Sequence, residues 1–113
     1  MKIKPENKLQ QECLKYLAEK YPDNIIHSVP NEIPYPLPPK IIGRIISLLQ
    51  SFGMLKGAPD LIMHAPNGIC YCIEFKTETG TQQKEQLQFQ KRMEKINGNY
   101  YVVKSLDELK LKL

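Results

Sequence analysis

The sequence predicts an α/β fold in which helices cover both faces of a mixed β-sheet. Three observations support this prediction. Stretches with helical and with strand periodicity alternate along the chain, in the order helix–strand–helix–strand–strand–helix–strand–helix. A Pro-Asn-Gly turn joins the two adjacent strands, which indicates an antiparallel hairpin. The length of 113 residues suits one small core, so we expect a single domain over residues 1–113.

The first half of the chain contains two predicted helices and one strand. Residues 6–20 are predicted to be a helix because Leu9, Cys13 and Leu17 recur at helical spacing, and Tyr21-Pro22 follows. Residues 24–29 are predicted to form a short strand. Residues 30–40 contain five of the nine prolines and should form an irregular surface loop. Residues 41–52 favour a helix, although their isoleucines leave a strand as the alternative.

The second half begins with a glycine-rich turn and the hairpin. The predicted hairpin strands are residues 60–65 and 69–77, and the turn is residues 66–68. Residues 81–98 are predicted to form a polar helix that ends at Gly98. Its apolar contacts should come from Leu87, Phe89, Met93 and Ile96. Residues 99–104 favour a strand, and residues 105–113 a short helix capped by a serine.

Composition places the protein among ordinary globular proteins. Apolar residues make up 42% and charged residues 25% of the chain, and the formal net charge is +4. This mild basic excess is compatible with a nucleic-acid partner. No apolar run approaches the length of a membrane span, so we expect no membrane partner. The N-terminus lacks the apolar core of a signal peptide, and three sparse cysteines suit a reducing compartment, so we expect a cytoplasmic protein.

Charged residues lie at unexpected places in the hairpin. Side chains alternate along a strand, so Cys70, Cys72, Glu74 and Lys76 share one face. The other face, with Ile69, Tyr71, Ile73 and Phe75, is predicted to face the core. A turn at residues 66–68 pairs residues whose numbers sum to roughly 134 to 136. Asp60 then lies opposite the segment from Glu74 to Lys76, within reach of both side chains.

Two neighbouring carboxylates repel each other unless a cation compensates them. Mg²⁺ takes one or two carboxylates together with waters and substrate phosphate oxygens. A lysine beside such a site can stabilise a developing negative charge. This pattern indicates hydrolysis of a phosphodiester. The alternative is a surface hairpin whose Asp60, Glu74 and Lys76 form solvated ion pairs, because short charged patterns are common.

Several segments together resemble the VRR-Nuc family, the virus-type replication–repair nucleases of the PD-(D/E)xK superfamily. The matching pieces are GAPD at residues 57–60, IEFK at 73–76, Gly80 with Gln86, and GNYYVV at 98–103. The segment VPNE at residues 29–32 also resembles phage members. The likeness runs from about Glu6 to Glu108 and implies a restriction-endonuclease-like core. Residues 33–52 match no motif of the family.

The resemblance implies a set of site residues. Asp60, Glu74 and the backbone carbonyl of Phe75 would be metal ligands, with Mg²⁺ as cofactor and Mn²⁺ as a substitute. Lys76 would be the catalytic lysine. A glutamine from the later helix maps to Gln86, for which an exposed helix position is the alternative.

The family also implies an acid from the first helix, which can be Glu6 or Glu12. Glu6 lies near the centre of the inward stripe that Leu9 and Cys13 help to define, whereas Glu12 lies about 100° away. Glu6 followed by Gln10 also resembles the family's E-x-x-x-Q. We therefore favour Glu6, whose alternative role is to complement the helix dipole.

The resulting hypothesis is a metal-dependent DNA endonuclease, possible substrates being branched or structured DNA in replication, repair or recombination. Lys56, Lys40 and Arg44 are candidates for DNA contacts, with a solvated basic surface as the alternative. A homodimer is expected because a lone domain of this size has a small surface. The rival hypotheses are an inactive nucleic-acid- or protein-binding module of the same fold, and a ribonuclease. His27 and His64 show no spacing that suggests a zinc site.

Overall fold

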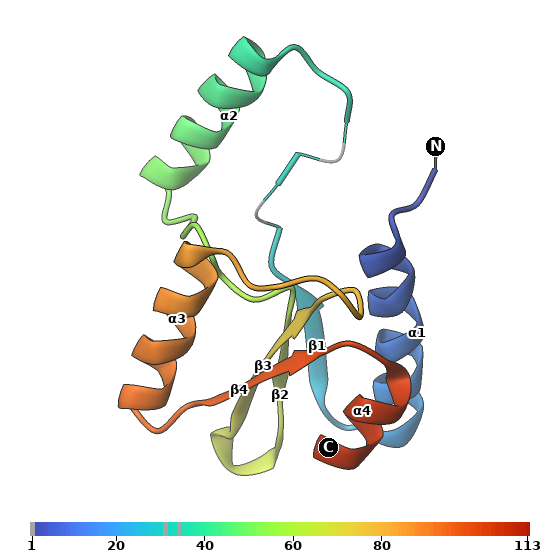
Figure 1. Ribbon diagram of the computed structural model, residues 1–113. Coiled ribbons are helices and arrows are strands. Elements are labelled where there is room, and N and C mark those ends of the chain that lie inside the picture. Colours follow the sequence, from blue (N-terminus) through green and yellow to red (C-terminus); the bar gives the residue numbers. More distant parts are fainter. Residues whose placement is uncertain (1, 31, 34) are drawn as a thin grey trace.

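The computed structural model describes residues 2–30, 32–33 and 35–113. Within these ranges the helices and strands follow the predicted order, which confirms the α/β prediction (Figure 1). The helices are α1 (Pro5–Lys20), α2 (Pro39–Ser51), α3 (Lys84–Lys95) and α4 (Leu106–Lys112), and a short 3₁₀ turn spans Pro66–Gly68. The strands are β1 (Ile25–Ser28), β2 (Leu61–His64), β3 (Cys70–Phe75) and β4 (Asn99–Val103).

The strands form one mixed sheet in the order β1-β2-β3-β4. Strands β1, β2 and β3 are antiparallel neighbours, whereas β4 runs parallel to β3. In the hairpin Leu61 faces Ile73, so paired residue numbers sum to 134, at one end of the predicted range. A parallel neighbour requires a long crossover connection, which the segment containing α3 supplies.

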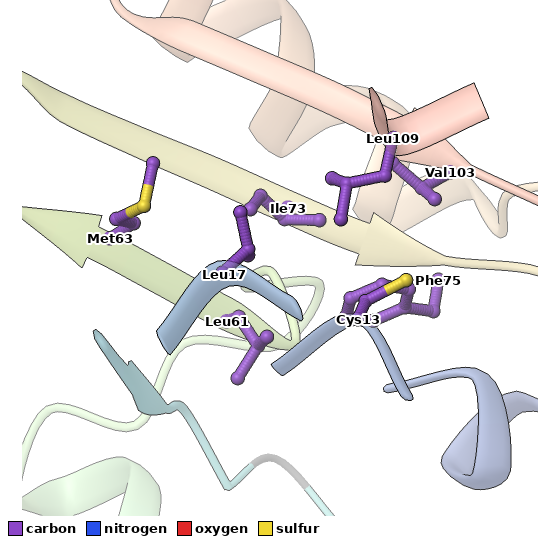
Figure 2. Packing of buried hydrophobic residues seen from close by; sticks show 8 residues of the cluster. All are labelled: Cys13, Leu17, Leu61, Met63, Ile73, Phe75, Val103 and Leu109. Atoms are coloured by element: carbon purple, nitrogen blue, oxygen red, sulfur yellow. The ribbon is translucent and has the colours of Figure 1, made fainter. Parts of the chain in front are cut away.

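Helices cover the two faces of the sheet unequally (Figure 1). Helices α1 and α4 pack against each other and against the sheet, and their buried side chains meet those of β2, β3 and β4 (Figure 2). The fully buried core of this face consists of Cys13, Leu17, Leu61, Met63, Ile73, Phe75, Val103 and Leu109. Helix α3 covers the opposite face of β4, where the Phe89 ring lies 6.1 Å from the ring of Tyr100.

Strand β3 is buried on both faces at its C-terminal end. Ile73 and Phe75 enter the core, and Cys72 and Glu74, which point the other way, are each only 2% exposed. The prediction that Ile69 belongs to the core is wrong: it is 43% exposed because it lies beside the turn at the tip of the hairpin. A strand enclosed on both sides leaves little water near any charge it carries, which makes Glu74 unusual.

Helix α3 ends differently from the prediction. Asn97, with φ of 60°, takes the left-handed position that was assigned to Gly98. The N–H groups of Asn97 and Gly98 donate to the carbonyl oxygens of Glu94 (3.1 Å) and Met93 (2.7 Å), which closes the last turn. Two of the residues expected to supply apolar contacts from this helix are exposed, Leu87 at 43% and Ile96 at 72%.

Helix α2 stands away from the sheet (Figure 1). It begins at Pro39, two residues before the predicted start, because proline is tolerated in the first turn of a helix. Within Pro39–Ser51, which the structure describes in full, no residue is buried, although Ile, Leu and Phe side chains recur along the helix and just beyond it. No helix in the described ranges has both the length and the hydropathy needed to cross a membrane.

Candidate active site

A buried turn positions the first acid of the site. Gly57 has φ of 88°, and a Cβ atom there would lie 2.3 Å from the backbone oxygen of Glu85 in α3. Only glycine allows both the left-handed backbone and this close approach. Ala58 and Pro59, which follow, are buried. The turn is therefore fixed against the start of α3, and it delivers Asp60 to the edge of the hairpin.

Asp60 is held by backbone groups on two strands. Its carbonyl oxygen accepts a hydrogen bond from the N–H of Val29 (3.0 Å), just beyond β1. Its Oδ2 accepts from the N–H of Phe75 at the end of β3 (2.8 Å). Burial raises the pKa of Asp60, whereas the hydrogen bonds that its carboxylate accepts from Phe75 and from protonated Glu74 act in the opposite direction. The carboxylate thus lies against the end of β3, as the hairpin register predicted.

Glu74 is a buried acid with one satisfied and one unsatisfied oxygen. Its Oε1 accepts a hydrogen bond from Nε2 of Gln86 (2.8 Å) and lies 3.8 Å from Nζ of Lys76. Its Oε2 is buried and has no hydrogen-bond partner among the described residues. Burial and the neighbouring charge of Asp60 raise the pKa of Glu74 to about 8. The ionised carboxylate is therefore stabilised poorly by the protein alone.

Lys76 supplies a nearly buried ammonium group, since its side chain is 9% exposed. Its backbone N–H donates to the carbonyl oxygen of Val103 (3.0 Å), which continues the pairing of β3 with β4 and fixes the start of the side chain. The single positive charge of Lys76 faces the two carboxyl groups of Asp60 and Glu74. One cation is too few to neutralise both if both are ionised.

These three side chains open into one polar cavity of about 210 Å³. The structure brings Glu6 of α1 into its wall, together with Gln10 one helical turn later. Glu12, the alternative acid, is exposed and does not line it. The charge of Glu6 adds to the causes that raise the pKa of Asp60 and Glu74. Further lining residues are Asn7, Glu32, Lys56, Gly57 and Gln83.

Gln86 has a defined contact in this cavity, unlike an exposed helix glutamine. Its Nε2 donates to Glu74, and its Oε1 accepts from the N–H of Gln83 (2.8 Å) at the start of α3. Both ends of the amide are therefore used, so Gln86 ties the orientation of Glu74 to the N-terminus of the helix. This contact makes Gln86 a residue that positions Glu74 in the structure as it stands.

Tyr100 is a neighbour of the site that sequence reasoning missed. It pairs with Cys72, shares the sheet face of Glu74 and is 8% exposed. Burial and the charge of Glu74 raise the pKa of its hydroxyl, which therefore stays protonated, and Gln82 lies within 3.5 Å of it. The parallel register of β3 and β4 brings Tyr100 here, and alternation within one strand carries no information about that register.

The candidate DNA-contacting residues lie in two places. Lys56 lines the cavity, and its ammonium group is 3.6 Å from the carboxylate of Glu85. Lys40 and Arg44 are exposed on α2 and do not line the cavity. Of the VPNE segment, Glu32 lines the cavity, whereas Asn31 lies outside the described residues.

The donor set of the cavity fits a hard divalent cation. Among the described residues, no group of three or more His, Cys, Asp or Glu side chains is arranged to hold a metal ion. The two close carboxyl groups of Asp60 and Glu74, one of them with an unpartnered buried oxygen, match the one or two carboxylates that Mg²⁺ takes from a protein. Water and substrate oxygens complete such a site, so the small number of protein ligands is compatible with it.

The sheet also brings together two histidines that the sequence did not relate. His27 on β1 and His64 on β2 are exposed, and their Nε2 atoms are 3.0 Å apart. Their ring centroids are 5.2 Å apart and the ring planes differ by 15°. This arrangement suits one shared N–H···N hydrogen bond, which needs one ring nitrogen protonated and the other free.

Comparisons with known proteins identify the fold. The chain matches no protein-family model and no curated protein sequence. One solved structure, described as "VRR_NUC domain", has a TM-score of 0.63 at 22% identity, over 93% of this chain and 89% of that one. Another, a "VRR_NUC domain protein", has a TM-score of 0.68 at 18% identity, over 96% of this chain and 84% of that one. The chain therefore shares the fold of these two VRR_NUC domain structures.

Proposed function

We propose that this protein is a metal-dependent nuclease that hydrolyses phosphodiester bonds in DNA. The observation that carries the proposal is the buried carboxyl pair of Asp60 and Glu74, with the unpartnered Oε2 of Glu74. Burying such a pair destabilises a protein unless a cation compensates it. We propose Mg²⁺ as that cation, and Mn²⁺ can substitute because it also prefers oxygen ligands.

Each residue of the cavity has a proposed role. Asp60 and Glu74 would hold the metal, with the Phe75 carbonyl as a third ligand. When bound, the metal would polarise the phosphate and activate the attacking water. Lys76, whose ammonium group lies 3.8 Å from Glu74, would stabilise the negative charge that develops on the phosphate. Gln86 would keep Glu74 in its orientation, and Glu6 would act as an acceptor from the α1 side.

Two rival functions use the same fold. One is a binding module that lacks the cleavage chemistry, and the other is a nuclease that cuts RNA instead of DNA. A binding module gains affinity from exposed cations and apolar contacts. Two carboxyl groups beside a nearly buried lysine contribute to neither, so they favour catalysis. DNA rather than RNA, and branched rather than linear DNA, are proposed from the VRR-Nuc likeness. A ribonuclease is the outcome if only RNA is cut.

We also propose that two copies of the chain associate through α2. Ile41, Ile45, Leu48 and Phe52 recur at helical spacing, and three of them are between 44% and 76% exposed. A helix of this length is marginal in water unless its apolar face is covered. In a two-fold dimer the same surface patch of each copy meets its counterpart. The apolar stripe of α2 in one copy can therefore pack against the apolar stripe of α2 in the other.

A cleavage assay tests the nuclease proposal. Purified protein is incubated with supercoiled plasmid, a four-way DNA junction and a structured RNA, each in Mg²⁺, Mn²⁺ or EDTA. We expect cleavage of DNA in either metal and none in EDTA. Asp60→Asn and Lys76→Ala should each lower the rate at least about a hundredfold, the range seen when a group that stabilises transition-state charge is removed.

Matched variants of exposed residues serve as controls. Asp23→Asn and Lys95→Ala change the same residue types at exposed positions outside the cavity and should cut at the wild-type rate. Absence of cleavage on every substrate, or equal rates for Asp60→Asn and Asp23→Asn, contradicts the proposal. Cleavage of RNA but of no DNA substrate would show that the protein is a ribonuclease.

A further inference from the structure

A second cavity adjoins the candidate active site. It measures about 440 Å³, and Asn7 and Glu32 line both cavities, so the two cavities adjoin at these residues. Its volume falls within the range of small-molecule binding pockets. The other lining residues come from the segment before α1, from Gln11 of α1, and from Ile33, Tyr35 and Pro36. We call it the Tyr35 groove, with Lys2, Ile3, Lys4, Ile33, Tyr35 and Pro36 as its walls.

The walls of the Tyr35 groove combine apolar surface with an exposed aromatic ring. The side chain of Tyr35 is 61% exposed and that of Ile3 40% exposed, and Ile33 and Pro36 extend the apolar surface. Among the described residues, the ring of Tyr35 has no ring contact of its own. An exposed ring beside apolar side chains favours a flat partner that can stack on it.

The rim of the same groove carries positive charge. Lys2 and Lys4 line it, and within the described ranges neither ammonium group has an ion-pair partner. One acid, Glu32, lies where the groove joins the active site. It disfavours a phosphate at that point but can accept a hydrogen bond from a base amino group. The charge distribution is thus complementary to a ligand whose phosphates lie on the rim and whose base lies inside.

We infer that the Tyr35 groove binds an unpaired nucleotide of the nucleic acid that the active site cuts. A base within a duplex is stacked and paired, so its face is not available to Tyr35, and duplex phosphates gain nothing from Ile3, Ile33 or Pro36. An unpaired nucleotide presents both a free base face and a phosphate. The inference rests on the proposed nuclease function and narrows its substrate to nucleic acid with a single-stranded segment next to the scissile phosphate.

Binding without metal tests the groove independently of catalysis. A fluorescein-labelled oligothymidine and a blunt two-stranded DNA duplex are titrated in EDTA, and fluorescence anisotropy is measured. Tyr35→Ala should weaken oligothymidine binding about tenfold and leave duplex binding unchanged, whereas Tyr35→Phe should retain the wild-type affinity. Replacing Lys2 and Lys4 by alanine should reduce the slope of log affinity against log salt by about 0.7 for each lysine, and Lys15→Ala should not.

A comparison of cleavage rates in Mg²⁺ tests nucleotide binding in the groove separately from the proposed nuclease activity. The wild type should cut a two-stranded duplex with a single-stranded overhang faster than a blunt duplex, and Tyr35→Ala should remove this preference. Equal cutting of both duplexes by both proteins contradicts nucleotide binding in the groove and leaves the nuclease proposal standing. If oligothymidine binding depends on Tyr35 but no substrate is cleaved, the groove binds nucleotides as inferred and the proposed nuclease activity is wrong. Equal affinity of the wild type and Tyr35→Ala for oligothymidine contradicts the inference that the groove binds an unpaired nucleotide.

Discussion

Glu74 is an acidic residue that the fold removes almost entirely from water. It is 2% exposed, one of its oxygens has no hydrogen-bond partner among the described residues, and its pKa is raised to about 8. Gln86 and Lys76 contact only the other oxygen. A side chain placed in this way reduces the stability of the protein without metal, and this consequence can be measured separately from catalysis.

The pH dependence of stability follows from the raised pKa. The unfolded Glu74 loses its proton near its ordinary pKa of 4.5, and the folded one near 8. Between these values the folded state binds more protons, so the free energy of unfolding falls as pH rises. In EDTA, Glu74→Gln should remove this loss and be more stable than the wild type by up to about 5 kcal/mol above pH 8, as measured by urea denaturation.

Glu19→Gln is the matched control, because Glu19 is exposed on α1. Its pH profile should follow that of the wild type. Parallel profiles for Glu74→Gln and the wild type would show that Glu74 is not stabilised in its protonated form, and would remove the main physical argument for a bound cation.

Metal binding should offset the loss in the free energy of unfolding that buried, ionised Glu74 causes. A ligand that binds only the folded state stabilises it by about 2.7 kcal/mol at a hundred times its dissociation constant. Mg²⁺ at pH 8 should therefore raise the melting temperature of the wild type in a calorimetric scan. Asp60→Asn and Glu74→Gln should show little increase, and Asp23→Asn the wild-type increase. The same increase in all four proteins would place the binding site elsewhere.

At the scale of elements, the site depends on how the turn at residues 57–60 meets α3. Gly57→Ala should destabilise the protein by about 2–4 kcal/mol, because φ of 88° is unfavourable for alanine and its Cβ would overlap the backbone of Glu85. Gly43→Ala is the control: Gly43 lies in α2 with nothing within 4 Å, so alanine should be neutral or stabilising. Equal urea midpoints for the two variants would contradict this account of the turn.

Helix α2 provides the test of self-association. Leu48 is 56% exposed on the apolar stripe, so Leu48→Glu should leave the fold intact and shift a dimer towards monomer in sedimentation velocity. Ser47 lies about 120° from the stripe on the polar side, and Ser47→Glu should sediment like the wild type. A wild-type protein that is monomeric at all concentrations rules out the proposed dimer.

The elements also show which parts of the fold can be predicted from sequence. The closeness of Asp60 and Glu74 follows from a short turn and the two-residue period of strands, both of which are local. The burial of Glu74 and the position of Tyr100 depend on how β4 and α3 pack over β3, which is long-range information. His27 and His64 were not related for the same reason, since the register of β1 and β2 brings them together. Asn97 replaced Gly98 at the end of α3 because both residue types accept positive φ.

At the scale of the whole molecule, an acidic cavity lies in a basic protein. The net charge is +4, yet the cavity is lined by Glu6, Glu32, Asp60 and Glu74 and by only two lysines. A phosphate approaching the ionised cavity is repelled unless a cation intervenes, whereas the surrounding surface attracts it. This charge distribution is the one expected for the proposed metal-dependent nuclease.

The rate of plasmid cleavage by the wild type and by Lys76→Ala, in Mg²⁺ and in EDTA, tests this account most directly. Lys76→Ala retains both carboxylates, so a calorimetric scan can verify that it still gains stability from Mg²⁺. We predict cleavage by the wild type in Mg²⁺ alone, and a rate at least about a hundredfold lower for Lys76→Ala. Cleavage that persists in EDTA, or equal rates for both proteins in Mg²⁺, would contradict the proposed site.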